Sequence, residues 1–196
     1  MAFGIKRTIQ GMKGWQLITL ERLFKNRFGK SLYRSVFGIR ECDHRLQFLV
    51  EQVERLTGLK DFGIYLNKLF TIDAFFLNED RHMHNIAVLM NDRGEFEYCP
   101  IFDNGAGLLS DTTMDYPMQE DIYPLMKQSQ SKTISMDYDE QLDVSELLYK
   151  ENLRFHFTKN DVRTLLESVS EYTEEEKYRV ETIIYMQMNK YKYLFQ

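Results

Sequence analysis

The stretch Asn78-Glu79-Asp80-Arg81-His82-Met83-His84-Asn85 decides the fold, and Asp103-Asn104-Gly105 begins eighteen residues after its end. An apolar run over residues 62–77 precedes it, with apolar positions spread around a whole helix, which predicts a helix buried on several sides. Two strand-like segments joined by a turn separate the two stretches. Because antiparallel strands bring the chain back on itself, we predict that Asn85 and Asp103 lie at neighbouring ends of a hairpin.

These residue types suit magnesium-dependent phosphoryl transfer. That reaction needs an acceptor for the proton of the attacking hydroxyl and oxygen ligands for the Mg²⁺ ions that bridge the nucleotide phosphates. Mg²⁺ takes a few carboxylate or carbonyl oxygens together with phosphate, so one Asp and one Asn are enough protein ligands. The pattern therefore predicts a kinase-type active site built on Asp80, Asn85 and Asp103.

Two other interpretations of the same residues stay open. Asp80 follows a helix, where an Asp often only caps or bends the chain. His82 and His84 belong to a D-x-H-x-H pattern whose carboxylate and imidazole groups suit zinc or iron, which would indicate a metal-dependent hydrolase. The remaining histidines, His44 and His156, have no ligand motif beside them.

Composition narrows the class of protein. The chain has 196 residues and a net charge of −5, which gives no electrostatic reason to expect nucleic acid or an anionic membrane as a partner. Cys42 and Cys99 lack C-x-x-C spacing and are typical of reduced thiols. Residues 1–7 lack the apolar core of a signal peptide, and no segment approaches the length of a membrane span. We expect a cytoplasmic protein.

Helical spacing extends over most of the N-terminal part. It predicts helices over residues 15–28, 31–37 and 41–56, after a loose start. The triplet Gly29-Lys30-Ser31 is not a P-loop, because Phe24 stands where the motif requires Gly. Asp61-Phe62-Gly63 has the letters of a kinase magnesium loop but precedes the catalytic stretch, so we expect Asp61 to cap the next helix.

The segments after the catalytic stretch alternate between strand, loop and helix. We predict strands over residues 86–90 and 95–102. Residues 104–140 are polar and irregular, and so long a connection is usually functional or mobile. Helix caps before two apolar stripes predict a helical hairpin in the C-terminal third, the second helix starting with a capping box at residues 173–176.

The two stretches also resemble a known family. Asp80-Arg81-His82-Met83-His84-Asn85 and Ile101-Phe102-Asp103-Asn104-Gly105 resemble the catalytic and metal-binding loops of HipA-like serine/threonine kinases. They are also similar to the D-R-H-x-x-N and D-x-G loops of phosphatidylinositol 3- and 4-kinases. The resemblance is strongest over residues 62–109. It implies a mainly α protein with a small β hairpin, an α+β fold equivalent to the C-terminal lobe of such a kinase.

The resemblance assigns roles to the site residues. Asp80 would be the catalytic base that orients the substrate hydroxyl, and Asn85 and Asp103 would be the magnesium ligands. His82 would lie beside the transferred phosphate and donate a hydrogen bond to its oxygens. Arg81, with His82, Asn85 and Asp103, would contact the Mg²⁺–ATP cofactor, or Arg81 would instead pair with a carboxylate and fix the loop.

The N-terminal part departs from the family. A complete kinase carries a small lobe with a Gly-rich phosphate cover and a strand lysine. Residues 1–61 have neither motif and are expected to form a helical region packed on the catalytic lobe over residues 62–196, in one compact unit. The chain therefore resembles a large lobe without its small lobe. Either the small lobe belongs to another chain or another segment, or the protein is a remnant that binds nucleotide weakly or not at all.

The resemblance implies Mg²⁺-dependent transfer of the ATP γ-phosphate to a protein Ser or Thr. The expected partners are ATP, that protein substrate, and a separately encoded small-lobe or antitoxin protein. The first alternative is a non-catalytic, kinase-derived binding module or toxin–antitoxin component. The second is the metal-dependent hydrolase.

Overall fold

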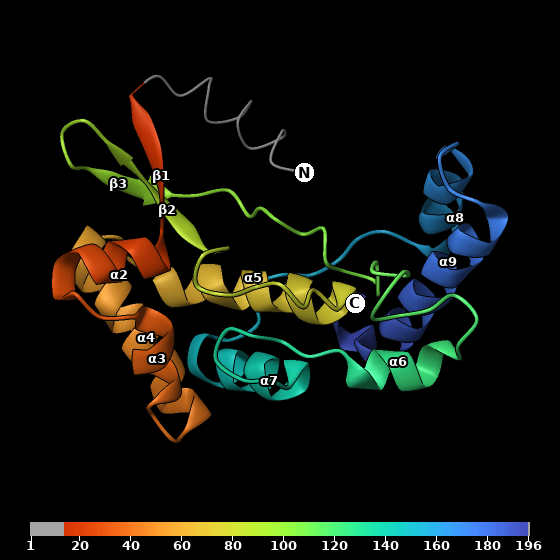
Figure 1. The fold of residues 1–196 in the computed structure, drawn as a ribbon, viewed down its shortest axis with the longest axis horizontal. Coiled ribbons are helices and arrows are strands. Elements are labelled where there is room, and N and C mark those ends of the chain that lie inside the picture. Colours follow the sequence, from red (N-terminus) through yellow and green to blue (C-terminus); the bar gives the residue numbers. More distant parts are fainter. Residues whose placement is uncertain (1–13, 196) are drawn as a thin grey trace.

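A computed structural model describes residues 14–195 of the chain. In chain order the elements are β1 (Trp15–Thr19), α2 (Leu20–Phe28), α3 (Leu32–Phe37), α4 (Cys42–Thr57), α5 (Phe62–Phe76), β2 (Ala87–Asn91), β3 (Phe96–Tyr98), α6 (Ile122–Gln128), α7 (Tyr138–Tyr149), α8 (Lys159–Glu167), α9 (Glu174–Lys190) and the 3-10 helix η1 (Lys192–Phe195). Helix α5 runs through the middle, with the sheet and α2–α4 at one end and α8–α9 at the other (Figure 1). The expected α+β class with a small sheet is confirmed.

The sheet has three antiparallel strands in the order β1-β2-β3. The predicted hairpin forms β2 and β3, with Val88 opposite Tyr98. The third strand corrects the prediction of a helix from residue 15, because residues 15–19 pair with β2 and the helix begins only at Leu20. A segment of five residues with apolar Trp15, Leu17 and Ile18 is too short for its period to separate helix from strand, and pairing with β2 decides between them. Strand β3 is also shorter than predicted, ending at Tyr98.

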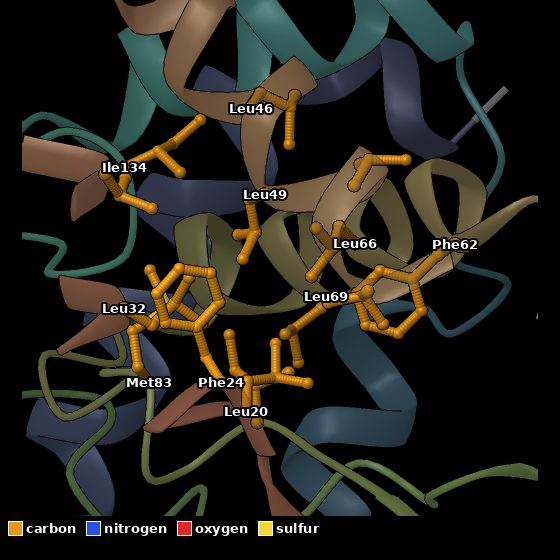
Figure 2. Close-up of a cluster of buried hydrophobic side chains, with 14 of the residues drawn as sticks. Leu20, Phe24, Leu32, Leu46, Leu49, Phe62, Leu66, Leu69, Met83 and Ile134 are labelled. Carbon is orange, nitrogen blue, oxygen red and sulfur yellow. The ribbon is translucent and has the colours of Figure 1, made fainter. Parts of the chain in front are cut away.

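One hydrophobic core lies between the N-terminal helices, the sheet and the first half of α5. Its side chains point toward one another from α2, α3, α4, α5 and the loop after α5 (Figure 2). The labelled members are Leu20, Phe24, Leu32, Leu46, Leu49, Phe62, Leu66, Leu69, Met83 and Ile134. Residues before and after position 61 share this core, so the N-terminal region packs directly on the catalytic part.

A second core surrounds the other half of α5. It joins that half to α6–α9, with buried members that include Phe75, Leu142 and Ile183. Helix α5 thus contributes to both cores and has buried side chains around most of its surface, as its apolar pattern predicts. A rigid helix in this position provides a firm support for the loop that follows it.

The predicted helix caps are confirmed at α8 and α9, and the predicted cap of α5 is wrong. The capping box of Thr173 and Glu176 starts α9, and a second box of Thr158 and Asp161 starts α8. Asp61 occupies the N-cap position of α5, but its side chain makes no capping hydrogen bond. The Glu54 carboxylate accepts the bond from the Phe62 N–H instead, at 2.9 Å, because Asp61 has a left-handed φ of 59°.

Candidate active site

The loop after α5 holds Asp80 and Asn85 against each other. The Asn85 Nδ2 donates to the Asp80 backbone carbonyl at 2.8 Å and to the Asp80 carboxylate at 3.1 Å. Asn85 is 9% exposed and the Asp80 side chain is 48% exposed. Because its nitrogen faces Asp80, the amide of Asn85 leaves Oδ1 without a donor among residues 14–195. A hard cation can use that oxygen.

Asp103 reaches the same loop through its backbone. The carbonyls of Asn85 and of Phe102, the residue before Asp103, both accept a hydrogen bond from Nη1 of Arg81. The structure therefore brings together the two ends that the hairpin predicts. Asp103 has a left-handed φ of 56° and is exposed, and no donor in the described chain contacts its carboxylate. Asp tolerates this conformation better than most residues do.

Arg81 is the side chain that joins the two loops. It is 0% exposed and forms a two-pronged ion pair with Asp73, with Nε–Oδ2 at 2.9 Å and Nη2–Oδ1 at 3.0 Å. Nη2 also donates to Oδ1 of Asn104. This buried pairing with a carboxylate is the arrangement expected for the alternative role of Arg81, in which it fixes the loop. Its assignment as a cofactor contact stays a prediction, and the burial of the guanidinium does not favour it.

Asp73 is a positioning residue that our sequence analysis missed. It is 0% exposed and also accepts a hydrogen bond from Asn78 Nδ2 at 2.8 Å. Burial raises the pKa of the Asp73 carboxyl, while Arg81 and Asn78 act in the opposite direction. The signal was present in the sequence: Asp73 is the single acidic residue within the apolar run 62–77, and a carboxylate in such a helix needs a buried partner.

His82 lies beside Asp80. Its Nδ1 accepts a hydrogen bond from the His84 backbone N–H at 3.2 Å, which leaves Nε2 to carry the ring proton. Nε2 is 3.4 Å from the Asp80 carboxylate. The His84 ring is perpendicular to that of His82, with ring centres 5.6 Å apart. Over residues 14–195 no three His, Cys, Asp or Glu side chains gather to hold a metal, so the hydrolase alternative gains no ligand set.

The segment after Asp103 folds back over the catalytic loop. The Glu79 carboxylate accepts hydrogen bonds from the Tyr116 hydroxyl and, at 3.1 Å, from the Gln130 N–H. The Thr133 hydroxyl donates to the Arg81 carbonyl. Part of the region predicted to be irregular is ordered, since it contains α6 and the start of α7. These contacts attach residues 116–133 to the loop that carries Asp80.

A cavity of about 880 Å³ adjoins Asp103. Its walls come from the C-terminal half of α5, residues 100–112, Met118 and the start of α9. Asp103 and Asn104 line it, whereas Asp80, His82 and Asn85 do not. The cavity therefore adjoins the candidate site through Asp103 and Asn104 and through Asp73 and Asn78, which also line it.

Comparison with known proteins shows a similarity of fold to a kinase. No protein-family model matches the chain, and no curated protein matches it either. The crystal structure of the Helicobacter pylori proinflammatory kinase CtkA is similar, with a TM-score of 0.57 and 18% sequence identity, over 90% of this chain and 68% of that chain. The chain has a kinase-like fold. At this identity the likeness is one of fold, and it does not single out the HipA-like family.

Two further observations concern membrane-spanning helices and the N-terminal elements. The helices of the described residues include none that is long and apolar enough to cross a membrane. Residues 14–61 form β1 and α2–α4, which are part of the lobe that carries the site.

Proposed function

We propose that this kinase-like chain is the large lobe of a HipA-like serine/threonine kinase that transfers the ATP γ-phosphate to a protein hydroxyl with Mg²⁺. One observation carries the proposal: buried Arg81 contacts both loops and leaves Asn85 Oδ1 and the Asp103 carboxylate free of hydrogen bonds in the described chain. Arg81 thus holds an amide oxygen and an exposed carboxylate on two adjoining loops, and these are the oxygen ligand types that Mg²⁺ takes.

Each residue then has a distinct task. Asp80 accepts the proton of the substrate hydroxyl, and Asn85 orients Asp80 by donating to its carboxylate and to its backbone carbonyl. Asn85 Oδ1 and Asp103 would hold Mg²⁺, which neutralises charge on the nucleotide phosphates when it is bound. The Nε2 proton of His82, 3.4 Å from Asp80, helps to orient that carboxylate or turns to the phosphate.

ATP binding needs a partner that supplies cations. Within the stretches 78–85 and 101–107, Arg81 is the sole Lys or Arg, and it is buried. Kinases use a strand lysine and a Gly-rich loop of the small lobe to bind the phosphates. We therefore propose that a separate small-lobe or antitoxin-like protein completes the nucleotide site.

The variant Asp80→Asn tests the catalytic role. We expect it to lower phosphotransfer by about 10²–10⁴-fold, because the base is lost while the amide keeps the shape of the side chain. The assay is transfer from labelled ATP and Mg²⁺ to the chain itself and to dephosphorylated casein, with the proteins encoded beside it added. Asp92→Asn, in the exposed turn between β2 and β3, is the matched control. Normal transfer by Asp80→Asn would contradict the assignment.

A second candidate is a non-catalytic, kinase-derived binding module. The absence of an exposed cation in the two loops favours it. Calorimetric titration with Mg²⁺–ATP, with and without the neighbouring gene products, separates the two candidates. Binding that appears with the partner and disappears in Asp103→Asn supports the kinase, and no binding under either condition supports the module.

A further inference from the structure

The cavity beside Asp103 has apolar walls that come from three elements. Ile72 and Phe76 contribute from α5, and Val180 contributes from α9. Ile101 and Leu108 contribute from residues 99–121 between β3 and α6, which we call the connecting segment. In Figure 1 the connecting segment runs from the sheet above α5 toward the end of α9. The cavity is large enough for several side chains and lies next to the metal-binding loop rather than over Asp80.

Backbone contacts fix the wall formed by the connecting segment. The Leu108 N–H donates to the Phe76 carbonyl at 2.7 Å, and a Cβ on Gly107 would lie 2.9 Å from that same oxygen. Leu108 and Leu109 both have left-handed φ values, 57° and 55°. Two successive non-glycine residues in this region cost free energy that the surrounding structure must compensate, and such strain concentrates at functional sites. These contacts hold the wall against the end of α5.

Arg179 fixes the far wall. It is 4% exposed and donates to the carbonyls of Tyr116 and Pro117, at 3.0 and 3.2 Å. These bonds attach the connecting segment to α9. Arg179 is the sole Lys, Arg or His lining the cavity, and its two terminal nitrogens already bind backbone oxygens. The Arg179 guanidinium therefore joins the connecting segment to α9.

Acidic residues are concentrated in the segments that line the cavity. Residues 94–126 contain seven acidic residues and no Lys, Arg or His. Among them Asp103 lines the cavity, Asp111 lies between two lining residues, and Asp115 lies in the loop between the lining residues Thr112 and Met118; all three are exposed. Glu171 and Glu175 are exposed next to the lining residues of α9 and the turn before it. We call these five residues the acidic rim. An apolar cavity with an acidic rim complements an apolar side chain flanked by cations.

We propose that this cavity docks the protein substrate through one aliphatic or aromatic side chain, with flanking Lys or Arg side chains on the acidic rim. The inference rests on the proposed kinase function, because it names the class of acceptor for that site. The acidic rim disfavours a phosphoinositide as the molecule docked in this cavity, because its polyanionic headgroup would be repelled by the carboxylates of the rim.

A synthetic peptide tests the docking site directly. The probe is a fluorescein-labelled peptide with one Leu between two pairs of Arg, and binding is measured by anisotropy without ATP. We expect binding that weakens with salt, falls at least about tenfold when Leu is replaced by Gly, and is lost when Arg is replaced by Glu. Equal binding of the Leu and Gly peptides would overturn the use of the apolar cavity.

Charge reversal on the protein provides the matched comparison. Asp115→Lys/Glu171→Lys changes two exposed rim positions, and Glu51→Lys/Asp143→Lys makes the same change in net charge on α4 and α7. We expect at least about a tenfold loss of affinity in the first variant only. Equal effects of the two variants would overturn the proposal.

The docking proposal and the kinase proposal fail in different ways. Asp80→Asn should bind the peptide normally while losing phosphotransfer. If the rim variant binds the peptide as well as the wild type does, docking at this cavity is wrong, even where phosphotransfer persists. If the peptide docks as expected but no phosphate transfer depends on Asp80, the kinase function is wrong. Binding of inositol hexakisphosphate at the rim would overturn the choice of a cationic partner.

Discussion

At the scale of single residues, the geometry of the candidate site depends on a buried ion pair. Asp80 is partly exposed, Asp103 is exposed and Asn85 is 9% exposed, whereas Arg81 and Asp73 are each 0% exposed. Arg81 satisfies its donors with one carboxylate, two backbone carbonyls and Asn104. A lysine has no planar fork to make these contacts together. The identity of this residue therefore controls the relative position of the two catalytic loops.

Replacing Arg81 should destabilise the protein as a whole. Arg81→Met leaves the Asp73 carboxylate buried without its cation, which typically costs about 3–5 kcal/mol of unfolding free energy. The matched control is Arg163→Met, which removes an exposed ion pair with Glu181 and should leave the unfolding free energy almost unchanged. Urea unfolding of both variants measures the difference. Equal losses would show that the buried pair is no more important than a surface one.

The two cysteines should be inert in the folded protein. Burial raises the pKa of Cys42 and of Cys99 from about 9 to about 11. Near pH 8 only about one thiol in a thousand is then ionised, about 100-fold fewer than in the unfolded chain. We expect iodoacetamide to label both residues in urea and neither in the native protein, as measured by mass spectrometry. Stoichiometric labelling of the native protein would contradict their burial.

The same shift has a consequence for stability at alkaline pH. The thiols lose protons near pH 9 when the chain is unfolded and near pH 11 when it is folded. The folded state thus binds more protons in this interval, so the unfolding free energy should fall as the pH rises from about 9 to about 11. Urea titrations across this interval should show a smaller fall for Cys42→Ala/Cys99→Ala. An unchanged slope would contradict the assignment.

At the scale of secondary-structure elements, the close packing of α5 against α7 depends on a glycine. A Cβ on Gly63 would lie 2.3 Å from the ring of Tyr149, well inside contact distance. Helix α5 cannot move away without disturbing the loop that carries Asp80, because the same helix holds Asp73. The α5–α7 contact therefore supports the site as well as the core.

Gly63→Ala tests this packing. Without the clash, alanine would stabilise a helix relative to glycine, by about 0.5–1 kcal/mol. We expect the opposite sign here, a loss of about 1–3 kcal/mol from overpacking, measured by thermal or urea unfolding. Tyr149→Leu in the same chain should recover part of the loss, which a double-mutant cycle would detect. Additive effects of the two substitutions would argue against direct contact.

At the scale of the whole molecule, α5 connects two cores and places the catalytic loop between them. The first core ties the loop to the sheet, and the second ties it to the C-terminal helices that form one wall of the Asp103 cavity. The fold likeness to CtkA extends over both parts, since it covers 90% of this chain. The candidate site and the proposed docking cavity thus share one support.

The sequence by itself determined the features that depend on near neighbours. The apolar pattern of α5, the hairpin of β2 and β3, and the Thr173–Glu176 capping box are local in origin, so periodicity and cap residues predicted them. The same local pattern located Asp80, Asn85 and Asp103. Only the tertiary structure decided that residues 15–19 form a strand, because a partner about seventy residues away supplies its hydrogen bonds.

The tertiary structure also decided the role of Arg81 and the existence of the cavity. Nothing adjacent in sequence shows that Arg81 faces Asp73 and the carbonyl of Phe102, or that the start of α9 lies across from Asp103. Local propensities act over a few residues, whereas burial of a charge and enclosure of a cavity depend on segments that meet only when both cores have formed.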